Sequence, residues 1–159
     1  MKLLTHQTLF IYFLFSITLS QNQLGSDIDG EAATDRFGSS ISISSDGTKL
    51  AVGAPLNDGN GSSSGHARIF QYSGGSWSQL GADIDGEASG DRFGHTIAID
   101  SDGNRVAISA YANDGNGSNA GHVRVFEYSG GSWSQKGSDI DGEAPGDRFG
   151  HSVSIDSDG

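Results

Sequence analysis

A 56-residue repeat limits the folds open to this chain more than any other property of its sequence. The sequence that begins at Gly25 begins again at Gly81 and at Gly137, without insertion or deletion. Residues 25–80 and 81–136 are identical at 36 of 56 positions, and residues 137–159 form a partial third copy. Repetition at a fixed period indicates that each copy is one structural unit, which buries its apolar face by stacking on its neighbours.

Each copy contains four short segments in which apolar residues alternate with polar or small ones, the pattern of a β-strand. In the second copy these segments are residues 95–100, 105–110, 122–128 and 133–140. Asp102–Gly103 and Gly130–Gly131 make tight hairpin turns, whereas long polar stretches at 113–118 and 141–147 make the other connections. Successive connections of an antiparallel meander lie at opposite ends of the sheet, so we expect all the long loops to gather on one face.

Four-stranded units repeated in tandem at about this length are typical of a β-propeller. We therefore expect an all-β propeller with one four-stranded blade per repeat, present here as an incomplete fragment. Ile97 and Ile99 share one side of their strand with Phe93, while Thr96 and Ala98 share the other, so a bulky face can pack on the small-residue face of the next blade. A single sandwich or a parallel β-helix are the alternatives, and both would give other periods.

The two ends of the repeat region carry expectations of their own. Residues 23–28 align with residues 79–84, which predicts that the repeats begin with an unpaired outer strand. The third copy stops inside a turn, at Ser157–Asp158–Gly159. Because domain boundaries fall in exposed linkers, we expect a longer open reading frame. The missing blades would come from the rest of that chain or from other copies.

Residues 1–20 differ in composition from everything that follows. Lys2 precedes an apolar run from Leu9 to Leu19, which at about 11 residues is too short to span a bilayer but suits a signal peptide. Small residues at Thr18 and Ser20 predict cleavage after Ser20, which leaves residues 21–159 as a secreted or cell-surface protein. A buried N-terminal strand or helix is the alternative.

Acidic residues outnumber basic ones by 20 to 9, which gives a net charge of −11. Phosphate binding needs clustered Lys and Arg, so nucleic acid is not an expected partner, and cations or basic surfaces are favoured instead. The chain has no cysteine, which excludes disulfides, thiolate metal sites and a cysteine nucleophile.

The repeat resembles the FG-GAP family, the repeat of integrin α-subunit propellers and of many secreted propellers. Phe37–Gly38, Phe93–Gly94 and Phe149–Gly150 supply the FG element, and Gly53–Ala54–Pro55 supplies the GAP element, which is Ser109–Ala110–Tyr111 in the second copy. Residues 65–70 and 121–126 are similar to the third strand of the family, and Trp77 and Trp133 resemble its non-integrin branch. The resemblance covers residues 24–159. We expect the Phe to pack in the core and the Gly to permit close backbone approach.

The resemblance also implies a calcium loop between the first two strands, of the form D-x-D-x-D-G-x-x-D. The corresponding residues 44–49 and 100–105 lack most of those ligands, so we expect plain hairpins there. If calcium binds, we expect it in the long loops, where two sets of oxygen ligands recur. One set is Asp58 and Asn60 with their copies Asp114 and Asn116, and the other is Asp83, Asp85, Glu87 and Asp91.

We expect a scaffold that recognises an extracellular protein or glycan through its long acidic loops, and not an enzyme. The propeller domain of an exported enzyme and a structural spacer without a ligand are the alternatives. His66, His95, His122 and His151 recur at repeat positions, which favours packing or hydrogen bonding over a singular catalytic site. Asn60 and Asn116 begin Asn-Gly-Ser glycosylation sequons on the long-loop face.

Overall fold

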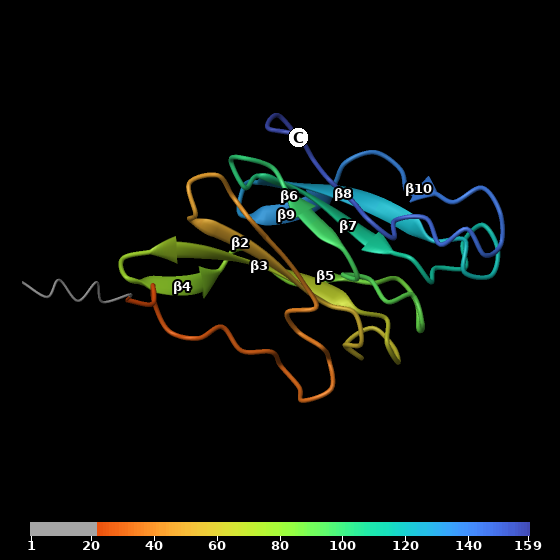
Figure 1. Cartoon of the computed structure of the whole chain (residues 1–159), viewed down its shortest axis with the longest axis horizontal. Helices are drawn as coiled ribbons and strands as arrows, with labels where there is room; N and C mark the ends of the chain where they lie inside the picture. The colour runs from red at the N-terminus through yellow and green to blue at the C-terminus, as the bar shows by residue number, and fades with distance from the viewer. Residues whose placement is uncertain (1–21) are drawn as a thin grey trace, which may run out of the picture.

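The computed structural model describes residues 22–159, so the predicted signal peptide lies outside the described residues. The described part is all-β and consists of two five-stranded antiparallel sheets without a helix (Figure 1). The first sheet contains β1 (Ser40–Ile43), β2 (Lys49–Ala54), β3 (His66–Ser73), β4 (Ser76–Gln79) and β5 (Ile84–Asp85). The second contains β6 (Ile97–Ile99), β7 (Arg105–Ala110), β8 (His122–Ser129), β9 (Ser132–Gln135) and β10 (Ile140–Asp141).

The two sheets have the same topology, as the repeat predicts. In the first, β1 pairs with β2, β2 with β3, and β3 with both β4 and β5, and the second sheet repeats this order from β6 to β10. The predicted strand 105–110 has the bounds of β7, while the predicted strand 95–100 is shortened to the three residues of β6. Each sheet is therefore one blade of a propeller-like fold.

The outer strand differs from the single segment predicted at residues 133–140. It is divided into β9 and β10, and likewise into β4 and β5, although both pieces pair with the same neighbour. Gly81 and Gly137 lie between the pieces with φ of +79° and +78°, a backbone conformation that cannot continue a strand. The strand therefore bends at each glycine and then pairs again over two residues. Asp83 and Asp139 lie in the bent segments, just before β5 and β10.

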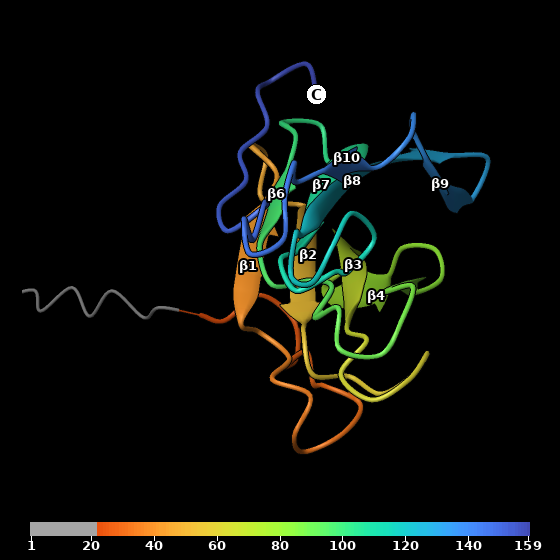
Figure 2. The same ribbon diagram turned by 90° about the vertical axis from the view of Figure 1, so that its right-hand side faces the viewer.

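The seam between the blades buries the apolar face of β6. The hydroxyl oxygen of Ser40 accepts a hydrogen bond from the backbone N–H of Ile97 at 2.9 Å, and that of Ser42 accepts one from Ile99 at 3.0 Å. Figure 2 shows the result: the inner strands β1 and β6 lie close together, and the outer strands β4 and β9 diverge, as blades do around an axis. The buried core includes Phe93, which is 0% exposed.

Glycine at the FG element is required by this seam, as predicted. A Cβ atom at Gly94, where φ is +84°, would lie 2.3 Å from the backbone oxygen of His66. One at Gly53 would lie 2.0 Å from the backbone oxygen of Gly94. No side chain fits at such distances, so the backbones of neighbouring blades touch directly at these two positions.

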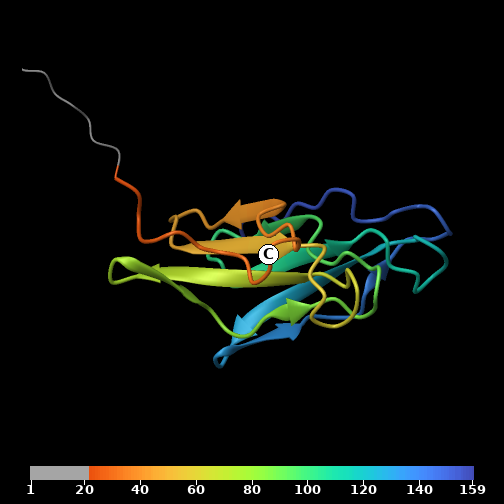
Figure 3. The same ribbon diagram turned by 90° about the horizontal axis from the view of Figure 1, so that it is seen from below.

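The long loops lie at one end of both sheets and the hairpin turns at the other (Figures 1 and 3). The loops also bind one another across the seam: the backbone N–H of Gly90 donates to the oxygen of Ser62, and that of Gly146 donates to the oxygen of Ser118, each at 2.9 Å. The predicted gathering of the long loops is thus confirmed by their contacts.

The partial copies at both ends lie against the blades without forming strands. Residues 23–28, predicted as an outer strand, form none, but the backbone oxygen of Leu24 accepts a hydrogen bond from the Trp77 indole, as that of Leu80 does from Trp133. Residues 151–156 likewise form no strand, because no second strand of their own copy accompanies them in the described chain. They still follow the seam pattern, since the Ser101 hydroxyl donates to the oxygen of Ser157 at 2.7 Å.

Candidate functional site

The long-loop face is held rigid by buried amide–carboxylate pairs. Asn57 donates from Nδ2 to Oδ2 of Asp35 at 2.8 Å, and Asn113 donates to Asp91 at 2.9 Å, with all four residues buried. Buried polar groups must be paired in this way, and a charge-assisted bond of this kind is stronger than a neutral one. Each pair fixes a b–c loop, the long loop between the second and third strands of a repeat, to the loop that precedes the same blade.

The candidate calcium ligands Asp58 and Asp114 serve as caps within these loops. Oδ1 of Asp58 accepts the backbone N–H of Ser63 at 2.7 Å, and Asp114 does the same for Asn119. Ser63 and Asn119 have φ of +51° and +52°, so each capped turn passes through the left-handed region. Both aspartates are exposed, and one carboxylate oxygen of each is already engaged by its own loop.

The other predicted amides, Asn60 and Asn116, bridge successive repeats. Nδ2 of Asn60 donates to the oxygen of Gly86 at 2.8 Å, and Nδ2 of Asn116 donates to that of Gly142 at 2.7 Å. The amide nitrogen that a glycan would use is therefore also a structural donor, although both residues are exposed. N-glycosylation at these two positions stays a prediction.

The third predicted set, Asp83, Asp85, Glu87 and Asp91, is separated by the fold. Asp91 is buried and bonded to Asn113, and it also accepts the backbone N–H of Ala88 at 3.1 Å. Asp85 is exposed in β5. Asp83 and Glu87 lie beside different histidines, so two members of the set belong to two separate clusters.

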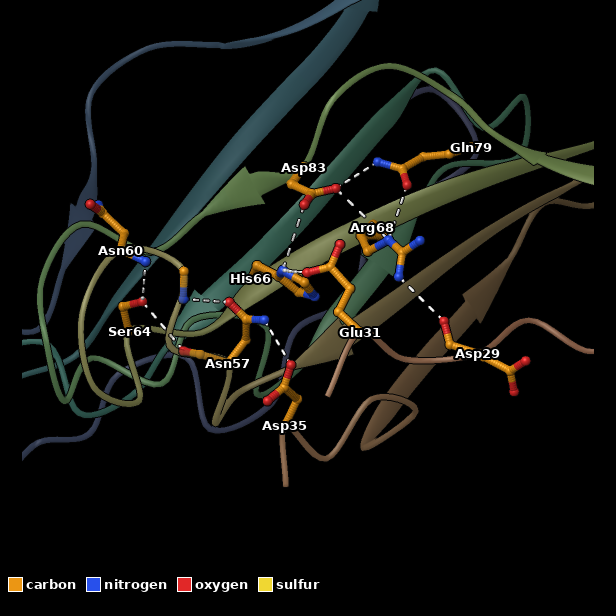
Figure 4. Close-up of polar contacts among 11 residues, drawn as sticks. Asp29, Glu31, Asp35, Asn57, Asn60, Ser64, His66, Arg68, Gln79 and Asp83 are labelled. Atoms are coloured by element: carbon orange, nitrogen blue, oxygen red, sulfur yellow. Dashed lines mark hydrogen bonds and ion pairs between the residues drawn. The ribbon is translucent and has the colours of Figure 1, made fainter. Parts of the chain in front are cut away.

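The first cluster joins Glu31, His66 and Asp83 (Figure 4). Nδ1 of His66 lies 3.9 Å from Oε2 of Glu31 and 3.9 Å from Oδ2 of Asp83. The histidine opens β3 and is 1% exposed, whereas the Glu31 carboxylate is half exposed and comes from the loop that precedes β1. One nitrogen and two carboxylate oxygens therefore converge at the edge of the loop face.

The second cluster, Glu87, His122 and Asp139, repeats the first 56 residues later. Nδ1 of His122 lies 3.5 Å from Oδ2 of Asp139, and His122 is also 1% exposed. Here Arg124 contacts the glutamate, with Nη1 3.2 Å from Oε1 of Glu87. Burial lowers the pKa of the His122 imidazole and the Arg124 charge lowers it further, against the opposing effect of Asp139 and Glu87.

Sequence reasoning did not predict these clusters, although it noted the recurring histidines. Packing or hydrogen bonding was expected of them, and His122 does meet the ring of Phe93 edge-on. Nε2 of both His66 and His122 is buried and has no hydrogen-bond partner among residues 22–159. The missed signal was spacing: a Glu 35 positions before the His and an Asp 17 positions after it recur in both copies.

The sequence matches the family model of the FG-GAP repeat over residues 27–70 and 82–126. The chain belongs to the FG-GAP repeat family. This confirms the resemblance, and the second matched range includes the Phe93–Gly94 pair at the blade seam. No curated protein matches the chain. No helix among residues 22–159 has the length and apolarity needed to cross a membrane.

The calcium loop associated with some FG-GAP repeats does not fit the hairpins of this chain. Asp46 uses its carboxylate to cap its own turn, accepting bonds from the Thr48 backbone, the Ser44 hydroxyl and the Thr48 hydroxyl, and these bonds lower its pKa. In the next hairpin the Lys49 ammonium donates to the backbone oxygen of Asp102 at 3.0 Å and to Oδ1 of Asn104 at 2.7 Å. A protein cation thus already lies against this turn, where calcium would need several free oxygens.

Proposed function

We propose that this FG-GAP chain is a secreted or cell-surface scaffold that recognises an extracellular protein or glycan through its long-loop face, without catalysing a reaction. The observation that supports this most is the pre-organisation of that face. Hydrogen bonds between loops of successive repeats, such as Asn60 to Gly86 and Gly90 to Ser62, fix the loops before any ligand arrives. A rigid surface loses less entropy on binding than a flexible one.

The charge of the same face favours a basic partner surface. Asp58, Asp85, Glu87, Asp114 and Glu143 all expose carboxylates there, in a chain with a net charge of −11. Such a field speeds the encounter with positive surfaces and makes binding weaken with salt. A glycan would instead be bound by hydrogen bonds to the loops, and its affinity would depend little on ionic strength.

Removing charge from the loop face tests this function. Asp85→Asn combined with Asp141→Asn changes two exposed, equivalent positions and keeps their size. Asp102→Asn, at the hairpin end, is the control for charge alone. We expect the loop variant to lose retention of basic extracellular proteins and the control to keep it, with a glycan array run in parallel. Equal binding by the wild-type chain and both variants would contradict a role for the loop face.

Export is the second part of the proposal, and it rests on residues 1–20. Mass spectrometry of the protein recovered from a secreting host should find Gln21 as the first residue. Secreted protein that retains residues 1–20 would contradict the cleavage site.

A further inference from the structure

Each of the two clusters of Glu, His and Asp contains a histidine whose side chain makes no hydrogen bond within the described part of the chain. His66 and His122 are each 1% exposed, Nε2 of each is buried without a partner there, and Nδ1 of each faces the carboxylates. The ligand atoms of each cluster lie within 4.8 Å of one another. We propose that each cluster binds a divalent cation of the zinc class, through Nδ1 of the histidine and one oxygen from each carboxylate.

The distances in the first cluster suit a bridging ion better than a direct contact. At 3.9 Å, Nδ1 of His66 is beyond hydrogen-bond reach of both Glu31 and Asp83. A zinc ion with bonds of about 2.1 Å separates two ligand atoms by about 3.4 Å at the tetrahedral angle. The 3.5 Å of the second cluster agrees with this separation, whereas the 3.9 Å of the first cluster requires its carboxylates to move slightly towards His66 when the ion binds.

The carboxylates are also oriented by other side chains, which is a mark of a built site. Gln79 donates from Nε2 to Oδ1 of Asp83 at 2.6 Å, which leaves Oδ2 to face His66 (Figure 4). Gln135 holds Asp139 in the same way, also at 2.6 Å. Groups in this position orient metal ligands and raise metal affinity. Gln79 in turn accepts from Arg68 at 3.0 Å, so the support is itself anchored.

The ligand set favours zinc-class ions over calcium. One imidazole nitrogen with two carboxylate oxygens suits borderline cations such as Zn²⁺, whereas Ca²⁺ prefers six to eight oxygens. Three protein ligands leave at least one position open, and the glutamate is the exposed member through which the ion would enter, since the Glu31 side chain is 48% exposed.

Because of where the two sites lie, a bound metal ion would cross-link successive repeats. Glu87 follows β5 of the first blade, while His122 and Asp139 belong to the second blade. A bound ion therefore ties the outer edge of one blade to the next. Each cluster has one arginine beside one of its carboxylates, since Arg124 contacts Glu87 and Nε of Arg68 lies 3.8 Å from Oδ1 of Asp83, so we expect the two clusters to bind the ion with similar affinity.

Zinc titration of the purified full chain, followed by calorimetry and by the absorption of Co²⁺ as a substitute, tests the proposal. We expect two ions per chain, one in His66→Gln and none in His66→Gln with His122→Gln. The variant Asp27→Asn is the matched control, because Gln23 holds Asp27 at 2.7 Å in the same way while no histidine of the described chain pairs with it. His95→Gln with His151→Gln should likewise keep both ions.

Further variants guard against misfolding of the histidine substitutions. Asp83→Asn and Asp139→Asn keep the side-chain shape and should each weaken one site at least ten-fold, with an unchanged circular dichroism spectrum. A stoichiometry that the His66 and His122 variants do not change, or zinc that is lost only with His95 and His151, would overturn the proposal. So would a wild-type chain that binds no zinc, or one that binds Ca²⁺ at the same residues as tightly as Zn²⁺.

Discussion

Ile97 and Ile41 occupy the same position in successive repeats, yet Ile97 is 6% exposed in the blade seam and Ile41 is 59% exposed. Ile99 and Ile43 show the same contrast, at 7% and 55%. The difference has one cause, because β6 has a preceding blade to pack against and β1 has none among the described residues. An apolar face shaped to receive a blade is thus open to solvent.

The open faces predict that the chain, expressed alone, self-associates or stays partly unfolded. Exposed apolar patches of this kind are association sites, and the trailing face of the second blade, with Val125 and Ile140, is the surface on which another copy could stack. Ile41→Ser with Ile43→Ser should shift the protein toward monomer in sedimentation velocity.

The equivalent change at Ile97 and Ile99 is the control, because it removes buried contacts and should unfold the seam instead. A wild-type chain that sediments as a single monomer and melts cooperatively would contradict this prediction.

Close backbone contact at the seam predicts a large cost for Gly94→Ala. Both this substitution and Gly90→Ala place a side chain at positive φ, +84° and +90°, which costs about 1–2 kcal/mol. Only at Gly94 does the new Cβ also clash with backbone atoms, so Gly94→Ala should lower the free energy of unfolding by about 2–4 kcal/mol in all. Urea denaturation of both, in the Ile41→Ser and Ile43→Ser background, measures the difference, and equal losses would contradict the packing described for the seam.

The fold could be predicted from the sequence to the level of blades, but not to the level of the outer strand. Alternation and turn residues suffice for β7, whose neighbours on both sides are regular. These two signals do not predict the interruption of the outer strand at Gly81 and Gly137, because a glycine inside an alternating segment is compatible with both an extended and a bent backbone. The bend at these residues decides where Asp83 and Asp139 point.

The candidate site could not be predicted from the sequence, because it depends on the directions in which neighbouring side chains point. Asp83, Asp85 and Glu87 are neighbours in sequence, so a shared site was the natural expectation. In the structure Asp83 faces His66 of its own blade, whereas Glu87 passes to His122 of the next. The direction of a side chain across a seam depends on how blades stack, and periodicity within one repeat does not specify this.

Acidification should destabilise the fold through His95. Burial lowers the pKa of this imidazole, and the positive charges of His151 and Arg92 lower it further, while Tyr111 packs on its ring at 4.3 Å. In the unfolded chain the pKa of this histidine is about 6.5, so below that pH the unfolded state binds more protons than the folded state. The contribution of His95 to the free energy of unfolding is therefore complete above a pH of about 6.5 and is lost as the pH falls below it. His95→Gln should reduce the loss between pH 7.5 and 5 in urea denaturation, and an unchanged pH profile would refute this.

Calcium should have little effect on stability. The hairpin oxygens are engaged by Thr48 and by Lys49, so a calcium ion would contribute at most the small term of a weak site. Millimolar calcium and a chelator should give similar melting temperatures. A large calcium-dependent rise that Asp46→Ala with Asp102→Ala abolishes would show that the hairpins are calcium sites.

Cross-linking across the repeat tests most directly whether successive 56-residue units stack as blades. The chain has no cysteine, so pairs can be introduced without background. Ser45 donates to the oxygen of Ser101 at 3.0 Å, whereas Ser76 and Ser132, with the same spacing, lie on the diverging strands β4 and β9 (Figure 2). A short bifunctional maleimide should join Ser45→Cys to Ser101→Cys rapidly within one chain and leave Ser76→Cys and Ser132→Cys unlinked. Equal rates for the two pairs, or linkage of the outer pair alone, would contradict the stacked-blade structure.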